Sequence, residues 1–253
     1  MDPTQWTLAL SPGLQTSPGD WAFVWDNAGY LAKGIVITVL LTATSMVLGF
    51  LAGFPAGAIE VYGRGPLRSA VRGAGVVLRG TPILVILFLL FFVSPLPLPE
   101  GDVTIPLLDD SLSFGMGAFL TATLGLGLRS AAYQSQIFRG ALQSVSEGQM
   151  EAARSVGLSK VAALRYVVVP QALRRSIPGF QNEFTIVLKD TSIAFAIGLA
   201  ELFARSDNLT TQQSTATLEL FLAISLVYFV LTFATNRSLD YLGRYYAIPG
   251  GNS

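Results

Sequence analysis

The sequence predicts an all-α integral membrane protein with about five transmembrane helices. Of its 253 residues, 51% are hydrophobic and only 13% are charged, whereas soluble domains usually carry about 25% charged residues. The run 34–59 contains no charge at all, and the basic residues gather in alternate connections between the apolar runs. A soluble helical bundle would have to bury that uncharged helix on every face, which argues against this alternative.

Five apolar runs are long enough to cross the ~30 Å hydrocarbon core of a bilayer at ~1.5 Å rise per residue. They are 34–59, 80–99, 111–128 with a continuation towards 138, 178–203, and 220–236. Hydropathy supports the fourth run least, because Lys189 and Asp190 lie adjacent to one another near its middle. Charges at that depth are costly unless they are paired or hydrated.

The distribution of basic residues predicts the orientation. Arginines and lysines concentrate between spans one and two, between spans three and four, and after span five, whereas the other connections are acidic apart from Lys33 and Arg205, which lie at the edge of a span. By the positive-inside rule, the N-terminus is outside and the C-terminus is cytoplasmic. We therefore predict an external N-terminal segment at 1–32, a membrane domain at 33–240 and a cytoplasmic tail at 241–253. The Pro-rich, acidic stretch 94–111 is typical of an irregular external loop.

Several kinds of chemistry are excluded by composition. The chain has no cysteine and no histidine, which removes disulfides, thiol nucleophiles, Ser-His-Asp triads and the usual zinc or haem ligands. It also has no GxxxxGK[ST] phosphate-binding loop. We therefore expect a protein that is not itself an enzyme and holds no metal or cofactor. The N-terminus has no basic region of the kind that starts a signal peptide, which predicts an uncleaved chain.

The long connection between spans three and four predicts local structure of its own. Residues 147–156 favour a helix, Gly157 can supply the left-handed residue that ends it, and Ser159 can cap a second helix. That second helix should run to Val169, because Pro170 interrupts the pattern. A compact helix-turn-helix in the cytoplasm serves either as a docking surface or as an interfacial helix on lipid headgroups. The residues alone leave both interpretations open.

A family resemblance bears on that choice. Glu151-Ala152-Ala153, three residues, Gly157, nine residues, and then Val167-x-Val169-Pro170 resembles the signature loop of bacterial and archaeal ABC importer permeases. The family pattern has Ile and Leu at the two valine positions. The blocks RGTPILVILF, AAYQSQIFRGALQSV, PQALRRSIPGFQNEF and LKDTS are similar to its polar amino-acid branch, the histidine, glutamine and arginine type. Gln136 departs from the glutamate that is common there.

The resemblance implies a type I ABC importer permease that works with three kinds of partner. These are a second permease copy or a homologue, an ATP-binding subunit that holds ATP-Mg, and an extracytoplasmic amino-acid binding protein. The permease would lie in the cell membrane of a prokaryote. Its cytoplasmic loop at about 140–176 would be the surface on which the ATPase docks. The residues expected to couple the two subunits are Glu151, Ala152, Ala153, Gly157, Leu158 and Pro170.

Charged and polar residues at mid-membrane depth mark a candidate substrate pathway. Arg129, Tyr133 and Gln136 share a helix face by their i, i+4, i+7 spacing, and Lys189 and Asp190 point about 100° apart around the next span. Arg129 could pair with Asp190 or Glu183, or with their counterparts in a partner permease. Alternatively, it could offer its guanidinium group to the α-carboxylate of an amino acid.

Two other functions are compatible with such charges. An ion-coupled secondary transporter could use Arg129, Lys189 and Asp190 as a relay, but such transporters usually contain internal repeats. We find no repeat, and five spans do not divide into halves. A non-transporting scaffold would leave the intramembrane charges as an unexplained cost.

Overall fold

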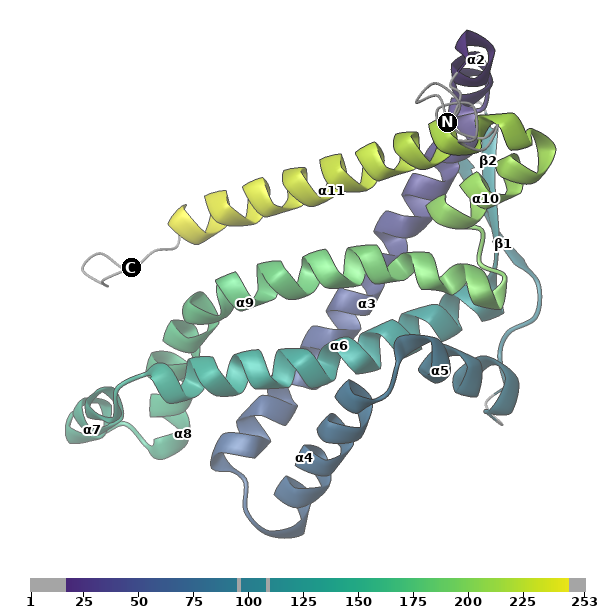
Figure 1. Ribbon diagram of the computed structural model, residues 1–253. Coiled ribbons are helices and arrows are strands. Elements are labelled where there is room, and N and C mark those ends of the chain that lie inside the picture. Colours follow the sequence, from purple (N-terminus) through teal and green to yellow (C-terminus); the bar gives the residue numbers. More distant parts are fainter. Residues whose placement is uncertain (1–16, 95–96, 108–109, 246–253) are drawn as a thin grey trace, which may run out of the picture.

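The computed structural model describes residues 17–94, 97–107 and 110–245, and it is almost wholly helical (Figure 1). The α-helices are α2 (Pro18–Asp26), α3 (Ala28–Tyr62), α4 (Gly65–Gly80), α5 (Ile83–Phe88), α6 (Met116–Ser144), α7 (Glu147–Ser155), α8 (Lys160–Ala163), α9 (Val169–Asp190), α10 (Leu202–Gln212) and α11 (Thr217–Tyr245). Short π-helical turns lie at η2 (Leu89–Val93) and η3 (Leu164–Val168), and 3₁₀ turns at η4 (Thr191–Ile197) and η5 (Ser214–Ala216). The helical fold class is confirmed.

The predicted spans fall on helices, but not all of these helices are equally apolar. By length and composition, two helical stretches of the described chain could each cross a membrane, Ala28–Tyr62 and Ser214–Tyr241. A third qualifies if α4 and the segment Ile83–Val93 count as one broken span, bent by 107°. Helices α6 and α9, at the third and fourth predicted spans, carry polar and charged residues that lower their hydropathy. Both pack within the bundle, where such residues can find partners.

Helices α3 and α6 form the centre of the bundle and approach closely along a stripe of glycines. A Cβ atom at Gly53 would lie 2.7 Å from the carbonyl oxygen of Ala131, and one at Gly57 would lie 2.7 Å from that of Ser135. Glycines four residues apart face the same neighbour, so their missing side chains let two backbones come together. This contact positions the polar residues of α6 relative to α3.

The N-terminal helix is tied to the connection between α10 and α11. Asp20 accepts hydrogen bonds from Gln213 Nε2 at 2.9 Å and Thr215 Oγ1 at 2.8 Å, and its side chain also bonds to Ser17. Figure 1 shows α2, α10 and the start of α11 gathered at one end of the molecule. Helix α3 begins at Ala28 and α11 continues to Tyr245, so both extend beyond the predicted membrane domain. The rest of the predicted tail lies outside the described residues.

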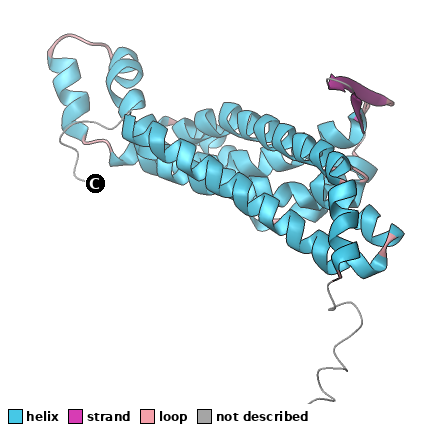
Figure 2. Ribbon diagram, turned by 90° about the horizontal axis from the view of Figure 1, so that it is seen from above, coloured by secondary structure: helices cyan, strands magenta, loops and turns pink. Residues whose placement is uncertain are grey.

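The prediction of an irregular external loop at 94–111 was wrong, because this region contains an antiparallel β-hairpin. Strand β1 (Asp102–Leu107) pairs with β2 (Asp110–Gly115), and Asp102 lies opposite Gly115. Apolar residues alternate along β2, and its Leu112 and Phe114 are buried in the main hydrophobic cluster. Figure 2 shows the strands at one end of the helical bundle, opposite the end that carries α7 and α8. The third predicted span therefore begins at Met116 instead of residue 111.

The prediction that Pro170 ends the second loop helix was also wrong. The helical backbone continues from α8 through η3 into α9, and Pro170 lies in the first turn of α9. Proline has no N–H to donate, and the π-helical turn before it is the kind of local distortion that accommodates such a gap in a helix. At its other end, α9 stops at Asp190 and passes into η4, well before the predicted end of span four at 203.

Candidate functional site

The first candidate site is the coupling knob, residues 147–168, which protrudes at one end of the bundle (Figure 1). Gly157 has φ +91°, a left-handed conformation that favours glycine. Its N–H bonds to Arg154 O at 3.0 Å and the Leu158 N–H bonds to Ala153 O at 3.2 Å, which together end α7. Ser159 Oγ accepts from the Ala162 N–H at 3.2 Å and caps α8. The predicted turn and cap are confirmed.

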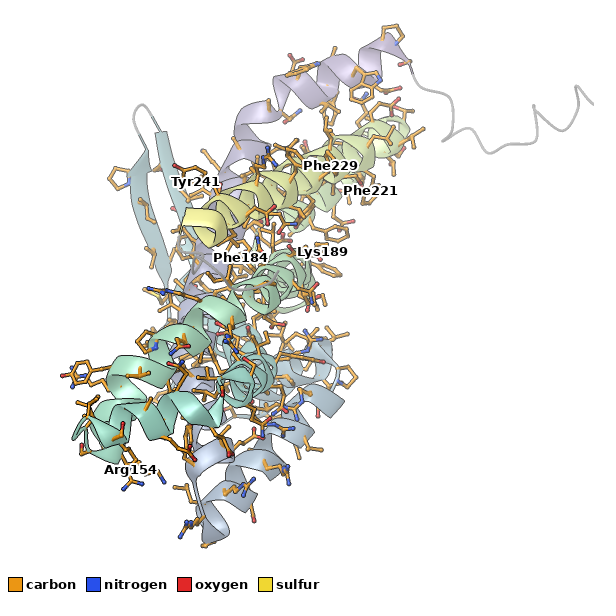
Figure 3. The ribbon with its side chains drawn as sticks, turned by 90° about the vertical axis from the view of Figure 1, so that its left-hand side faces the viewer. Arg154, Phe184, Lys189, Phe221, Phe229 and Tyr241 are labelled. Carbon is orange, nitrogen blue, oxygen red and sulfur yellow. The ribbon has the colours of Figure 1, made fainter. Side chains whose placement is uncertain are left out.

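The six predicted coupling residues divide between the surface and the interior of the coupling knob. Glu151, Ala152 and Gly157 are exposed, whereas Ala153 is buried. Leu158 and Pro170 are partly buried. Ala153 therefore supports the internal packing of the knob. The exposed surface of the knob is formed by the residues next to Ala153 in sequence. One of them is Arg154, which Figure 3 labels near the tip of the knob.

Three apolar side chains of the coupling knob are exposed and were missed by sequence reasoning. Val156, Val161 and Tyr166 are 78%, 74% and 66% exposed. A groove of about 500 Å³ also separates the base of the knob from the ends of α3 and α6, with Tyr62 and Glu151 among its lining residues. The missed signal was the presence of large apolar residues in a segment otherwise rich in charge. Exposed apolar residues beside a groove are typical of a protein interface.

The second candidate site lies within the bundle, where α6 meets the end of α9. Arg129 Nη1 forms an ion pair with Asp190 Oδ2 at 2.5 Å, and the guanidinium group lies over the ring of Tyr133 at 5.2 Å. The two charged side chains are 20% and 22% exposed. Of the alternatives for Arg129, the structure contains the ion pair with Asp190. Among the described residues, Glu183 is buried and makes no ion pair with Arg129.

Gln136, the third member of the predicted polar face, is bound to α3. Its Nε2 donates to Glu60 Oε1 at 2.9 Å, and Arg139 Nη1 lies 3.3 Å from Glu60 Oε2. Glu60 is only 3% exposed. Sequence reasoning missed Glu60, because it lies one residue beyond the predicted end of span one and no nearby residue in the sequence indicates what it pairs with. The glutamine thus shares a buried carboxylate with an arginine.

Lys189 differs from Arg129 in having no partner. Among the described residues, no hydrogen bond or ion pair reaches this exposed side chain. It lines a groove of about 520 Å³ between α9 and α11, together with aromatic residues that include Phe221, Tyr228 and Phe229. Figure 3 shows Lys189 beside the α11 segment that carries Phe221 and Phe229. Among the residues that the structure describes, the groove combines the ammonium group of Lys189 with aromatic walls and the hydroxyl groups of Ser192, Ser225 and Thr232, which suits an organic anion.

A comparison with known families places these features in context. The model of the family described as "Binding-protein-dependent transport system inner membrane component" matches residues 45–247. The chain belongs to this family. It is therefore a membrane component of a binding-protein-dependent transport system, and the predicted resemblance is confirmed.

Individual relatives point in the same direction. The chain is 33% identical to the probable amino-acid permease protein YxeN of Bacillus subtilis, over 91% of this chain and 97% of that protein. It is 33% identical to the octopine transport system permease protein OccM of Rhizobium radiobacter, over 87% of each chain. It is 30% identical to the glutamine transport system permease protein GlnP of Escherichia coli, over 89% and 96%. The match to a family of binding-protein-dependent transport components contradicts the ion-coupled alternative.

Solved structures confirm the type I ABC importer fold. A crystal structure of an amino acid ABC transporter with histidines superimposes with a TM-score of 0.72 at 28% identity, covering 88% of this chain and 96% of that one. The methionine ABC transporter MetNI in an inward-facing form gives a TM-score of 0.65 at 17% identity, a likeness of fold alone.

Proposed function

We propose that this chain is the permease subunit of an ATP-driven amino-acid importer. The observation that carries the proposal is the coupling knob, which combines a left-handed turn at Gly157 with exposed apolar residues outside the bundle, in a chain of this family. The names of YxeN, OccM and GlnP support amino acids or their derivatives as the substrate class. The enzyme activity and ATP-Mg belong to a separate ATP-binding subunit.

The coupling knob is the surface on which that ATP-binding subunit docks. Val156, Val161 and Tyr166 would lose their exposure to water in the complex, which favours association through the hydrophobic effect. The left-handed Gly157 directs the chain from α7 into α8 and so determines how these side chains are presented. The groove at the base of the knob offers a recess for a partner side chain.

The two ends of the molecule indicate where the remaining partners would bind. The coupling knob lies at the cytoplasmic end, and the β-hairpin with α2 lies at the outer end, where an external binding protein would deliver substrate (Figure 2). This orientation puts the N-terminus outside, in agreement with the distribution of arginines. Helix α11 also exposes Leu226 and Phe233, which lipid or a second permease would cover.

Lys189 is the first residue of the pathway that we expect a substrate carboxylate to meet. Arg129 is engaged by Asp190, so its guanidinium group must leave that carboxylate before it can bind another in a bidentate manner. Lys189 needs no such release, because its side chain is free and lines a groove large enough for an amino acid. In this scheme Arg129, Tyr133 and Asp190 hold the helices around the route. Gln136 fixes α6 to α3.

Transport by the reconstituted complex tests the proposal. The permease would be placed in proteoliposomes with its ATP-binding subunit and binding protein, and uptake of labelled amino acids would be followed with and without ATP. We expect uptake that requires ATP and is unaffected by collapse of ion gradients. Uptake driven by an ion gradient without ATP, or no uptake of any amino acid, would contradict the proposal.

A further inference from the structure

Glu201 is a fully buried acidic residue that lies where α3, α10 and α11 meet, and the proposed transport route gives it no role. It is 0% exposed. Its carboxylate caps the start of α10, because it accepts hydrogen bonds from the backbone N–H groups of Phe203 at 2.9 Å and Ala204 at 2.8 Å. Thr38 Oγ1 on α3 lies 3.5 Å from the same carboxylate and accepts from the Leu202 N–H at 3.3 Å. Glu201 therefore ties the first turn of α10 to α3.

The same carboxylate also holds a tyrosine of α11. The Tyr228 hydroxyl donates to Glu201 Oε2 at 3.2 Å. Tyr228 lines the groove between α9 and α11 that contains Lys189, whereas the buried Glu201 does not line it. Because its hydroxyl is bound to a residue outside the groove, Tyr228 contributes mainly its aromatic ring to the groove wall.

A second aromatic residue of this groove depends on Glu201 through the backbone. Phe203 lines the groove and begins in the turn that Glu201 caps. Its ring centroid lies 6.0 Å from that of Phe221 and 5.2 Å from that of Phe195, within the usual range for aromatic pairs. One carboxylate thus fixes wall residues from two helices, Phe203 on α10 and Tyr228 on α11.

These contacts explain why a buried acidic residue is present in an apolar bundle. Such a group is costly unless its hydrogen bonds are made, and a fully bonded polar network holds its members rigidly. Aromatic rings attract ammonium groups and pack on apolar side chains, so the wall suits the remainder of an amino acid whose carboxylate meets Lys189. We propose that Glu201 is a positioning residue for the amino-acid groove, which holds Tyr228 and Phe203 in place without touching the substrate. The inference rests on the proposed function, since it takes this groove as the amino-acid site.

Protection of an introduced cysteine measures binding in the groove directly, because the chain has no native cysteine. Ser225→Cys is an exposed position that lines the groove. The assembled complex in nanodiscs, without binding protein or ATP, would be treated with a methanethiosulfonate reagent in the presence of L-glutamine, L-arginine, L-histidine or L-phenylalanine. The concentration that halves the rate of modification gives the affinity, and the amino acid that protects best is used throughout. If none protects, the proposal is overturned, and ATP-dependent uptake by the same complex would show that the importer function nevertheless holds.

Two matched hydroxyl deletions then test the bond to Glu201. Tyr228→Phe removes the hydroxyl that Glu201 holds and leaves the ring. The control Tyr30→Phe removes a hydroxyl that accepts from Asn208 Nδ2 at 3.5 Å, between α3 and α10, from a residue that does not line the groove. We expect half-protection in Tyr228→Phe to need about fivefold more amino acid, as for a lost hydrogen bond, and no change in Tyr30→Phe. Equal half-protection in Tyr228→Phe and the parent Ser225→Cys complex would overturn the proposal.

A double variant tests whether Glu201 acts through the tyrosine. Glu201→Gln has one oxygen for the donors that two oxygens serve, and we expect it to weaken protection by about fivefold or more. If the effect passes through Tyr228, Glu201→Gln/Tyr228→Phe should bind no more weakly than Glu201→Gln alone, because coupled residues are not additive. Two losses that multiply would overturn the proposal. So would a lower Tm in Glu201→Gln with unchanged half-protection, which a purely structural role would produce. If Glu201→Gln does not assemble, the comparison of Tyr228→Phe with Tyr30→Phe decides.

Discussion

The coupling knob and the Arg129–Asp190 pair both contain charged residues, but water surrounds the charges of the knob, whereas the charges of the pair are neutralised by each other. The coupling knob leaves Glu151 and Arg154 in water together with exposed apolar side chains, and its shape depends on hydrogen bonds between near neighbours in sequence. The pair joins residues 61 positions apart in a partly buried place. A surface built from local contacts can change without unfolding the bundle. When one member of such a partly buried pair is removed, the other charge is left without its partner in a place that water reaches only in part.

The largest effect on stability should come from breaking that pair. Arg129→Gln leaves the Asp190 carboxylate without its partner, and we expect a loss of about 3 kcal/mol in unfolding free energy, seen as a lower Tm and less assembled complex. Arg129→Lys should retain assembly, because the positive charge remains. The double variant Arg129→Gln/Asp190→Asn should recover most of the loss. If the double variant is as unstable as the sum of the two single variants, the ion pair does not have the structural role assigned to it.

Transport assays should distinguish the substrate-binding role proposed for Lys189 from the structural role proposed for Arg129. Lys189→Met removes a free cation from the groove, so we expect about a tenfold loss of amino-acid uptake with little change in Tm, within the usual range for a lost charged contact. Lys189→Arg should keep a substantial part of the activity. Uptake by Lys189→Met at the wild-type rate would show that the substrate carboxylate binds elsewhere.

A smaller effect is expected at Glu60, where a buried carboxylate accepts hydrogen bonds from the side chains of Ser135, Gln136 and Arg139. Gln136→Glu would place a second carboxylate within hydrogen-bond distance of Glu60, and we expect about 1–2 kcal/mol of destabilisation from the like charges. Glu60→Gln combined with Gln136→Glu exchanges the two groups and should restore stability. Equal Tm values for wild type and Gln136→Glu would show that Arg139 neutralises both carboxylates.

The smallest effect concerns the pH dependence of the outer end. Hydrogen bonds from Ser17, Thr215 and Gln213 lower the pKa of Asp20 below 3.8. A carboxyl whose pKa is lower in the folded state stabilises the fold above its unfolded pKa, and that contribution is lost as the pH falls through the folded pKa. The difference in Tm between wild type and Asp20→Asn should therefore be fully present at pH 7 and shrink as the pH falls below the ordinary titration range of an aspartate, towards the lowered pKa of Asp20. A constant difference across this range would contradict the assignment.

The two regions also differ in how far the sequence could predict them. Gly157 and Ser159 act through turn and cap geometry, which depends on residue type and short spacing, so the turn of the coupling knob was predictable. The pairing of Arg129 with Asp190 could be suggested but not chosen over other partners, because the rotation of α6 against α9 depends on packing along their whole length. Glu60 was missed because it lies just beyond the predicted end of span one, and because its donors on α6 depend on how α3 and α6 pack together.

Other failures came from local signals that tertiary contacts overrode. Pro170 normally ends a helix, but the π-helical turn at 164–168 lets the backbone continue. The proline-rich composition of 94–111 concealed an alternation of apolar residues that folds as a hairpin. The exposed Val156, Val161 and Tyr166 could not be recognised as a surface until the buried face of the knob was known.

The most direct test of the central claim, that the coupling knob transmits ATP hydrolysis to transport, is the substrate-stimulated ATPase activity of the reconstituted complex with Gly157→Trp. This substitution needs a strained left-handed backbone and adds bulk to the docking surface. The matched control is Gly29→Trp, at an exposed glycine near the outer end with open space around it. We predict that both variants insert and assemble, that the strained backbone lowers the Tm of Gly157→Trp only slightly because the coupling knob lies outside the bundle, and that only Gly157→Trp loses stimulation by about tenfold or more, as expected for a broken coupling of this kind. Normal stimulation in Gly157→Trp, or equal loss in both variants, would contradict the account.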